Sequence, residues 1–120
     1  MTRADPRQLQ ILKQGPDAWN AWRVENPGIK PCVAGGDLQN IDLAGANLEG
    51  ADLRRAEIRS AKLMRARLDA ADMRGTDFSD SNLCHVTAPR ALFIQANLRG
   101  ANLCGADLRD CHLNDANLAK

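Results

Sequence analysis

The chain has 120 residues, of which 16 are Lys or Arg and 15 are Asp or Glu, so its formal net charge is +1 at pH 7. This length fits one small domain, and the near balance of charge gives neither the basic stripe expected of a nucleic-acid-binding protein nor a strongly acidic surface. No stretch is apolar enough to cross a membrane and residues 1–6 lack the apolar run of a signal peptide, so we expect a cytoplasmic protein without nucleic-acid or membrane partners.

Residues 1–30 differ from the rest of the chain and predict two short helices. Asp5 followed by Pro6 is typical of an N-cap and a first helical residue. Pro16 should end or kink this helix, because the residue before a proline avoids the helical region. A second helix is expected over 16–25, before an Asn-Pro-Gly run stops it.

The second helix predicts a cap for the residues that follow. One of its faces would carry Ala18, Trp19, Ala21 and Trp22. Both tryptophans need cover, and the first apolar residues of the next part of the chain offer it, at Leu38, Leu43, Leu48 and Leu53. Because the terminal units of a repeat array need a cap, we predict that residues 1–30 form a helical cap, with 31–35 as a linker. The alternative for Trp19 and Trp22 is a ligand site.

From residue 36 onward, leucine or a comparable apolar residue recurs every five positions, with one lapse at Ala88. In a helix, five residues advance by about 500°, which spreads such residues around the cylinder. In a strand, an odd spacing alternates them between the two faces. A chain that bends equally after each five residues can send all of them to a common axis. The period therefore predicts a solenoid.

The neighbouring positions fit a narrow interior joined by tight turns. Ala stands two residues before the central position in eleven units, as expected where only a methyl group fits. Asp or Asn stands one residue before it in eleven units, and these side chains bond nearby backbone donors. We interpret these Asp and Asn residues as turn formers, against metal binding or acid-base chemistry.

Several segments resemble the repeats of the pentapeptide-repeat family. They are Ala-Asn-Leu-Glu-Gly (46–50), Ala-Asp-Leu-Arg-Arg (51–55), Ala-Asn-Leu-Arg-Gly (96–100) and Ala-Asp-Leu-Arg-Asp (106–110). The resemblance covers residues 36–120 and implies an all-β solenoid, a right-handed quadrilateral β-helix with four pentapeptides per coil. The N-terminal segment also resembles leaders that precede such repeats in bacterial proteins.

The coil over 76–95 departs most from the repeat. Its inner small positions hold Thr76, Ser81, Val86 and Ala91. Phe78 and Phe93 flank Ala88 among its central residues, so we interpret the two rings as filling the space that Ala88 leaves. Pro89 removes a backbone donor, and we expect a bulge or a distorted corner there.

Leu92 and Ile94 would point outward from this coil, where other units carry mostly polar or small residues. The same face also carries two arginines, Arg54 and Arg74, and two aspartates, Asp52 and Asp72. Adjacent exposed aliphatic side chains beside an arginine ladder make Leu92, Ile94, Arg54 and Arg74 the candidate protein-binding surface. The plainer interpretation is a solvated face.

The four cysteines are Cys32, Cys84, Cys104 and Cys111. Cys111 falls at an inner position and is expected to replace alanine. Cys84 and Cys104 are twenty residues apart and would stack in adjacent coils, about the separation that a disulfide tolerates. Together with His85 they fall short of a closed zinc site, so we expect free thiols, no metal and no cofactor.

The last coil has no predicted cap. Its central residues are Leu103, Leu108, Leu113 and Leu118. An uncapped coil end exposes apolar side chains and strand edges, which favours pairing with a second copy. Homodimerisation through this end is a hypothesis, although a truncated chain would end in the same way.

No enzyme constellation is present, because the chain has two histidines and no nucleophile motif, phosphate loop or closely spaced cysteine pair. We expect a non-enzymatic scaffold that binds an unidentified protein partner through the faces of the coil. The resemblance implies an alternative, because some members of the family imitate duplex DNA, bind type II topoisomerases such as gyrase and confer quinolone resistance. The mixed charge of residues 36–120, eleven basic and twelve acidic, and the absence of long interrupting loops disfavour it.

Overall fold

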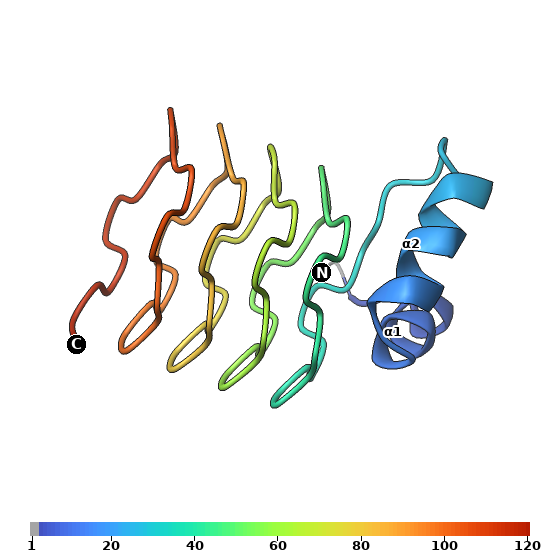
Figure 1. Ribbon diagram of the computed structural model, residues 1–120, viewed down its shortest axis with the longest axis horizontal. Helices are drawn as coiled ribbons and strands as arrows, with labels where there is room; N and C mark the ends of the chain where they lie inside the picture. The colour runs from blue at the N-terminus through green and yellow to red at the C-terminus, as the bar shows by residue number, and fades with distance from the viewer. Residues whose placement is uncertain (1–2) are drawn as a thin grey trace.

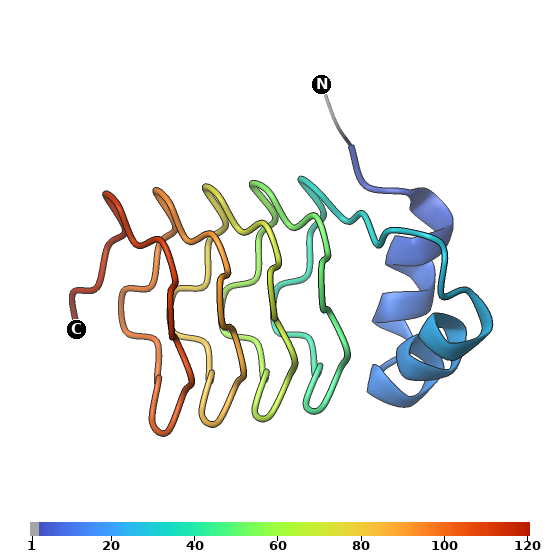
Figure 2. The same ribbon diagram turned by 90° about the horizontal axis from the view of Figure 1, so that it is seen from above.

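The structure is a computed structural model that describes residues 3–120, so residues 1 and 2 of the N-terminal run considered above lie outside the described part. Two helices, α1 (Pro6–Lys13) and α2 (Pro16–Glu25), lie against one end of a stack of coils, and the C-terminus lies at the other end (Figure 1). Neither helix is long and apolar enough to pass through a membrane. The view from above shows the same order of helices and coils along the stack (Figure 2).

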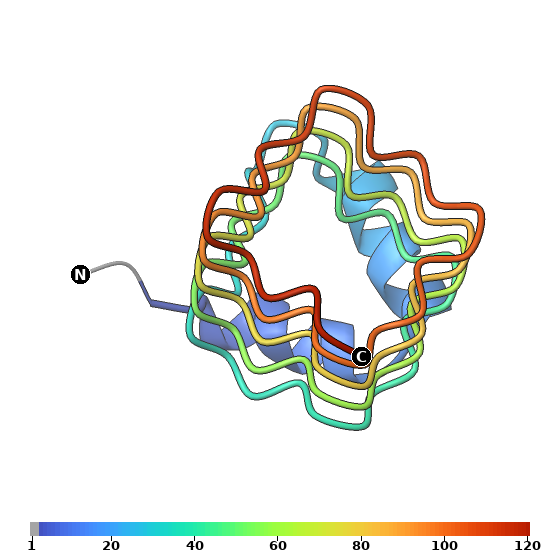
Figure 3. The same cartoon turned by 90° about the vertical axis from the view of Figure 1, so that its left-hand side faces the viewer.

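The remainder of the chain winds in coils of twenty residues. Parallel bridges join each bridged residue to the one twenty positions later, from Cys32 with Asp52 to Asn97 with Asn117. Seen along the axis, the coils superpose in a four-sided outline, with one five-residue unit to a side (Figure 3). Within residues 3–120 no strand extends beyond a single bridge, because a turn follows each bridge almost at once.

Backbone hydrogen bonds between successive coils follow one pattern throughout. Leu43 N–H donates to the carbonyl oxygen of Lys62 at 2.7 Å, and Gly45 N–H donates to that of Met64 at 2.9 Å. In return, Lys62 N–H donates to the carbonyl oxygen of Ile41 at 2.9 Å. Three hydrogen bonds for every five residues thus hold each coil to the next and fix the twenty-residue register.

Each side ends in a turn that needs a left-handed residue. Ala46 N–H donates to the carbonyl oxygen of Leu43 at 3.0 Å, and Gly45 between them has φ 74°. A positive φ recurs every five residues from Gly35 to Asp115, and eleven of these residues are not glycine. A positive φ at the third residue is what a type II turn requires.

The interpretation of the Asp and Asn residues as turn formers is confirmed. All eleven accept a hydrogen bond on the side-chain oxygen from the N–H two residues later, at 2.9–3.3 Å. This bond satisfies an N–H that makes no bond to a neighbouring coil. The Asp and Asn side chains therefore complete the backbone pairing that the ladder leaves open.

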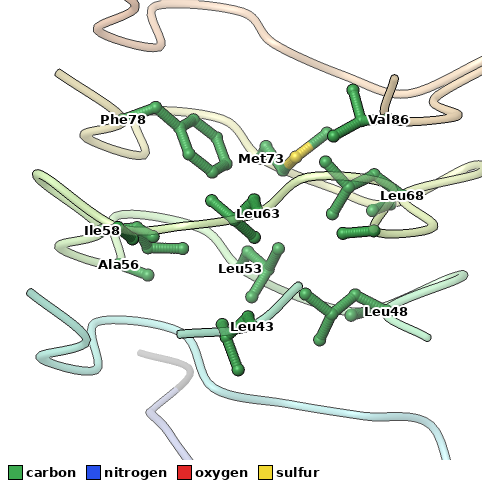
Figure 4. Packing of buried hydrophobic residues seen from close by; sticks show 14 of the residues in the cluster. Leu43, Leu48, Leu53, Ala56, Ile58, Leu63, Leu68, Met73, Phe78 and Val86 are labelled. Atoms are coloured by element: carbon green, nitrogen blue, oxygen red, sulfur yellow. The ribbon is translucent and has the colours of Figure 1, made fainter. Parts of the chain in front are cut away.

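The central apolar residues fill the inside of the coils in columns of like side chains. Leu43 lies below Leu63, and Leu48 below Leu68, all with no exposed surface (Figure 4). The alanines from Ala46 to Ala96 that precede them by two positions are buried as well. Burial decreases in the last coil, where Leu103 is only half-buried.

In the coil over 76–95, the unusual polar residues of the interior all have hydrogen-bond partners. The buried hydroxyls of Thr76 and Ser81 donate to the carbonyl oxygens of Leu53 and Ile58 at 2.6 Å and 2.5 Å. The rings of Phe78 and Phe93 have centroids 6.2 Å apart, and Ala88 is fully buried. These contacts agree with the expectation that large neighbours fill the space beside Ala88.

The predicted distortion at Pro89 is wrong. Ala88 N–H and Arg90 N–H still donate to the next coil at 2.8 Å and 2.9 Å, and the carbonyl oxygen of Pro89 accepts from Ala70 at 3.0 Å. The reason is positional: the residue after a central residue directs its N–H to the Asp or Asn of its own unit and not to another coil. A proline there removes no hydrogen bond of the ladder.

The two helices contact the first coil through both apolar and polar groups. Trp19 is fully buried, and its Nε1 donates to the carbonyl oxygen of Asn47 at 2.7 Å. Trp22 is half-buried and stacks on Trp19 with ring centroids 5.0 Å apart. Ala21, expected on the same face, is exposed.

Polar side chains of α2 form hydrogen bonds with backbone N–H and carbonyl groups on the helix-facing side of the first coil. Asn20 Oδ1 accepts from Asn47 N–H at 2.7 Å, and Asn20 Nδ2 donates to the carbonyl oxygen of Gly45 at 3.0 Å. Arg23 donates to the carbonyl oxygens of Asn47 and Glu49 at 2.8 Å and 3.1 Å. These side chains take the place of a preceding coil.

Replacing Leu63 by Asp should unfold the protein, because a buried carboxylate without a partner costs several kcal/mol. The matched change Leu103→Asp should be tolerated better, since Leu103 is only half-buried in the last coil. Urea denaturation followed by circular dichroism measures both variants. A Leu63→Asp protein as stable as the Leu103→Asp protein would contradict the packing described above.

Replacing Trp19 by Ala should lower the free energy of unfolding by about 3–5 kcal/mol, because it empties a buried site and leaves the carbonyl oxygen of Asn47 with one donor fewer. Trp22→Ala should cost clearly less, because Trp22 is only half-buried. Urea titration of the two variants compares them. Equal losses would show that the two rings contribute alike.

Candidate protein-interaction site

Leu92 and Ile94 lie on the outside of the coil, and both are half-buried. Leu92 forms a parallel bridge with Asp72, and the carbonyl oxygen of Ile94 accepts from Gly75 N–H at 3.0 Å. The register therefore places Leu92 over Asp72, and Ile94 over Arg74. The structure brings the four predicted residues of this face, Leu92, Ile94, Arg54 and Arg74, into two adjacent columns.

Both arginines are held by the aspartate two residues before them. Arg54 Nε and Nη2 donate to Asp52 at 2.9 Å and 2.7 Å, and Arg74 Nε and Nη2 donate to Asp72 at 2.8 Å and 2.6 Å. Arg54 Nε also lies 3.8 Å from Asp72 in the next coil. The same bidentate pair recurs between Arg109 and Asp107 on another side. Such paired forks are rigid and nearly neutral, so the ladder offers shape more than free charge.

The pairing changes the acidity of these groups. The side-chain hydrogen bond from Arg54 is the main reason that the pKa of Asp52 lies below its usual range. Partial burial opposes ionisation of Asp72, but the hydrogen bonds from Arg74 and the charges of Arg74 and Arg54 outweigh it, and its pKa is lowered too. The bond to Asp52 raises the pKa of Arg54.

An open depression of about 1040 Å³ adjoins this ladder where the chain before α1 meets the coil. Its lining includes Arg54, Arg74, the exposed Arg55, Leu9 of α1 and Gln95 next to Ile94. The N-terminal segment is tied to the coil beside this depression, because Asp5 N–H donates to the carbonyl oxygen of Cys32 at 3.0 Å. The depression reaches Gln95, but Leu92 and Ile94 are not among its lining residues.

The predicted dimer residues lie together at the C-terminal end of the stack. Leu103, Leu108 and Leu113 are half-buried, and Leu118 is 55% exposed. Within residues 3–120, the N–H groups of Leu103, Leu108 and Leu113 donate no hydrogen bond. This side of the last coil therefore presents unpaired donors around leucine side chains.

The four cysteines are free thiols. Cys111 is half-buried, and its Sγ donates to the carbonyl oxygen of Ala88 at 2.7 Å. Burial raises the pKa of this thiol. Within the described chain, no three His, Cys, Asp or Glu side chains gather closely enough to share a metal ion.

Sequence reasoning missed the polar residues that join the helices to the coil. Asn20 and Arg23 contact Asn47, and Gln8 Oε1 accepts from Cys32 N–H at 2.6 Å. Polar residues on a short helix give no periodic signal of their own. Only the position of Asn20 beside Trp19 and of Arg23 one turn later could have suggested that they face the same partner.

Acid should destabilise the protein in part through Asp52. Because its folded pKa is lowered, the ion pair contributes stability above the unfolded value of about 3.9 and loses it as the pH falls through the folded value. Asp52→Asn, which keeps an oxygen for Arg54 N–H, should lose less stability between pH 7 and pH 3 than the original chain. Urea midpoints at the two pH values test this, and Asp107→Asn should change the pH dependence less, because that ion pair is more exposed. An unchanged pH dependence in Asp52→Asn would contradict it.

Comparison with known proteins identifies the repeats. The family model for pentapeptide repeats matches eight copies, over residues 37–69, 61–91 and 89–120. No curated protein matches the chain. Among solved structures, the pentapeptide repeat protein alr5209 from Nostoc is 26% identical, with a TM-score of 0.69 over 92% of this chain and 83% of that one.

Other solved structures match over shorter parts. HetL, a pentapeptide repeat protein involved in heterocyst differentiation regulation in Nostoc, is 30% identical with a TM-score of 0.45, and the match covers 72% of this chain but only 44% of HetL. QnrB1, a plasmid-mediated fluoroquinolone resistance protein, is 20% identical with a TM-score of 0.36, over 72% of this chain and 46% of that one. The family matched is one of structural repeats and indicates no catalytic activity. The matched repeats cover most of this chain, which therefore belongs to the pentapeptide-repeat family.

Proposed function

We propose that this chain is a non-enzymatic scaffold that binds a protein partner through the faces of a right-handed quadrilateral β-helix. The observation that carries the proposal is the pair Leu92 and Ile94, two adjacent outward aliphatic side chains in register with the arginine ladder of Arg54 and Arg74. Their position one coil above bidentate ion pairs gives an apolar patch with a rigid polar border. Protein interfaces commonly combine an apolar centre with a polar rim.

The repeat supplies a precise way to remove this patch. Leu92 and Ile94 occupy the positions that Asp72 and Arg74 occupy one coil earlier, and Ile94 N–H donates no hydrogen bond within the described residues. The double change Leu92→Asp with Ile94→Arg would therefore extend the Asp-x-Arg series and give this N–H an acceptor. We expect the free energy of unfolding to stay within about 0.5 kcal/mol.

Affinity purification from the organism of origin, in a cytoplasmic extract, should recover a protein with the original chain and lose it with the double variant. Asn97→Asp is the matched control, because it creates the same Asp-x-Arg arrangement with Arg99 on another side and removes no apolar residue. The control should retain the partner. Equal recovery by the double variant would exclude this face as the binding surface.

Gyrase is the alternative partner, and a DNA supercoiling assay separates it from the main proposal. The balanced charge of the repeats does not favour imitation of DNA, so we expect the purified chain neither to inhibit supercoiling nor to protect gyrase from quinolones. Inhibition that survives Leu92→Asp with Ile94→Arg would favour the alternative.

Self-association through the C-terminal end is a separate proposal. The exposed Leu118 and the unpaired N–H groups of Leu103, Leu108 and Leu113 support it. Sedimentation across a concentration series should show a dimer that Leu118→Asp dissociates. A monomer at all concentrations would leave the lateral faces as the interaction surface.

A further inference from the structure

Three sulfur-containing side chains follow one another up one side of the coil. They are Met64, Cys84 and Cys104, which we call the sulfur column. The ladder fixes their register, because Arg65 N–H donates to the carbonyl oxygen of Cys84 at 3.0 Å and His85 N–H donates to that of Cys104 at 2.8 Å. Met64 and Cys84 are half-buried and Cys104 is exposed, so solvent reaches the column.

The backbone holds the two cysteines firmly. Asn82 Oδ1 accepts from Cys84 N–H at 3.0 Å, and Asn102 Oδ1 accepts from Cys104 N–H at 3.1 Å. Leu83 N–H donates to the carbonyl oxygen of Asn102 at 2.7 Å, which ties the two turns together. Residues stacked in this way keep the spacing of neighbouring strands, about 4.8 Å.

A spacing of about 4.8 Å lies within the Cα–Cα range of disulfides, but it exceeds the Cβ–Cβ distance that a disulfide needs. A disulfide holds its two Cβ atoms about 3.8 Å apart, so the coils would have to approach each other by about 1 Å at this point. The hydrogen bonds on both sides of Cys84 resist such a movement. Both thiols are free in the structure.

The same spacing suits an ion held between two sulfur atoms. With the zinc–thiolate bond length of about 2.3 Å as the scale, a linear two-coordinate ion places its two sulfurs about 4.6 Å apart. Thiolate and thioether ligands select soft ions such as Cu(I). We propose that Cys84 and Cys104 bind one Cu(I) ion as a linear dithiolate.

The binding step needs no oxidant or reductant. Cu(I) forms two copper–sulfur bonds, the two thiols release their protons to solvent, and the resulting complex carries one negative charge. The proposal revises the expectation of no metal site, which considered only a closed zinc set.

His85 lies next to this site without completing a zinc set. Its Nδ1 occupies the space where a side chain at position 105 would begin, so the ring lies over Gly105, the neighbour of Cys104. The ring is thus adjacent to the column, yet no three His, Cys, Asp or Glu groups of the described chain converge. A site that needs only two thiolates is consistent with this arrangement.

Competition for Cu(I) tests the proposal. The full chain, reduced and under nitrogen, is titrated into the Cu(I)–bicinchoninate complex, and the loss of its visible absorbance measures transfer of the ion. We expect one Cu(I) per chain, with the affinity lowered at least about 100-fold in Cys84→Ser and in Cys104→Ser. X-ray absorption of the loaded protein should show two sulfur neighbours, and Met64→Leu should leave both in place.

Cys32→Ser is the matched control, because Cys32 is also a half-buried free thiol on the outside of a coil. It should bind Cu(I) as the original chain does, and circular dichroism should show that all variants keep their fold. Failure of the original chain to remove Cu(I) from bicinchoninate would overturn the proposal. So would unchanged affinity in either Cys84→Ser or Cys104→Ser, or an equal loss in Cys32→Ser.

Discussion

The hydrogen-bond ladder between successive coils is the constraint on which the rest of this structure depends. It joins residues twenty positions apart, with three bonds for every five residues. A coil alone has no regular strand. Each of its sides holds a single bridge residue, and that residue pairs only with a neighbouring coil. Stability must therefore come from stacking, as in other repeat proteins, and any change that shifts the register disturbs every column at once.

The ladder uses only some of the backbone N–H groups, and side-chain oxygens accept hydrogen bonds from many of the others. The Asp and Asn residues before the central positions bind the N–H two residues later, so the repeat satisfies its turns from within each unit. At the first coil, where no earlier coil exists, Asn20 and Arg23 of α2 bind the open groups around Asn47. The helices thus cover the apolar end and also pair its polar edge, which a purely hydrophobic cap would leave unsatisfied.

The same register makes the outer surface a set of columns, and the chemistry of each column depends on residues twenty positions apart. One column runs through Cys32, Asp52, Asp72, Leu92 and His112, so its chemistry changes from coil to coil. The sulfur column changes likewise, from Met64 to Cys84 and Cys104. A surface of this kind can change its ligand or partner by single substitutions that leave the core untouched.

Much of this arrangement could be predicted from the sequence, for a physical reason. Leucine every five residues, alanine two positions earlier, and Asp or Asn between them each reflect a local requirement of a unit, and a local requirement leaves a periodic trace. The helix over Pro6–Lys13 could likewise be predicted from Asp5 and Pro6, because capping acts over three residues. Pro89 was misjudged because the sequence does not show which N–H groups point to another coil.

The sequence by itself determined the period, the inward and outward positions, and the two short helices, since these depend on interactions within a few residues. The tertiary structure decided which side chains meet across coils and across the helix–coil boundary. Bidentate pairing of Arg54 with Asp52, the contact of Arg23 with Asn47, and the free donors of the last coil all follow from the stacking of turns in space. Such contacts join residues without a common local pattern, and only the folded chain brings them together.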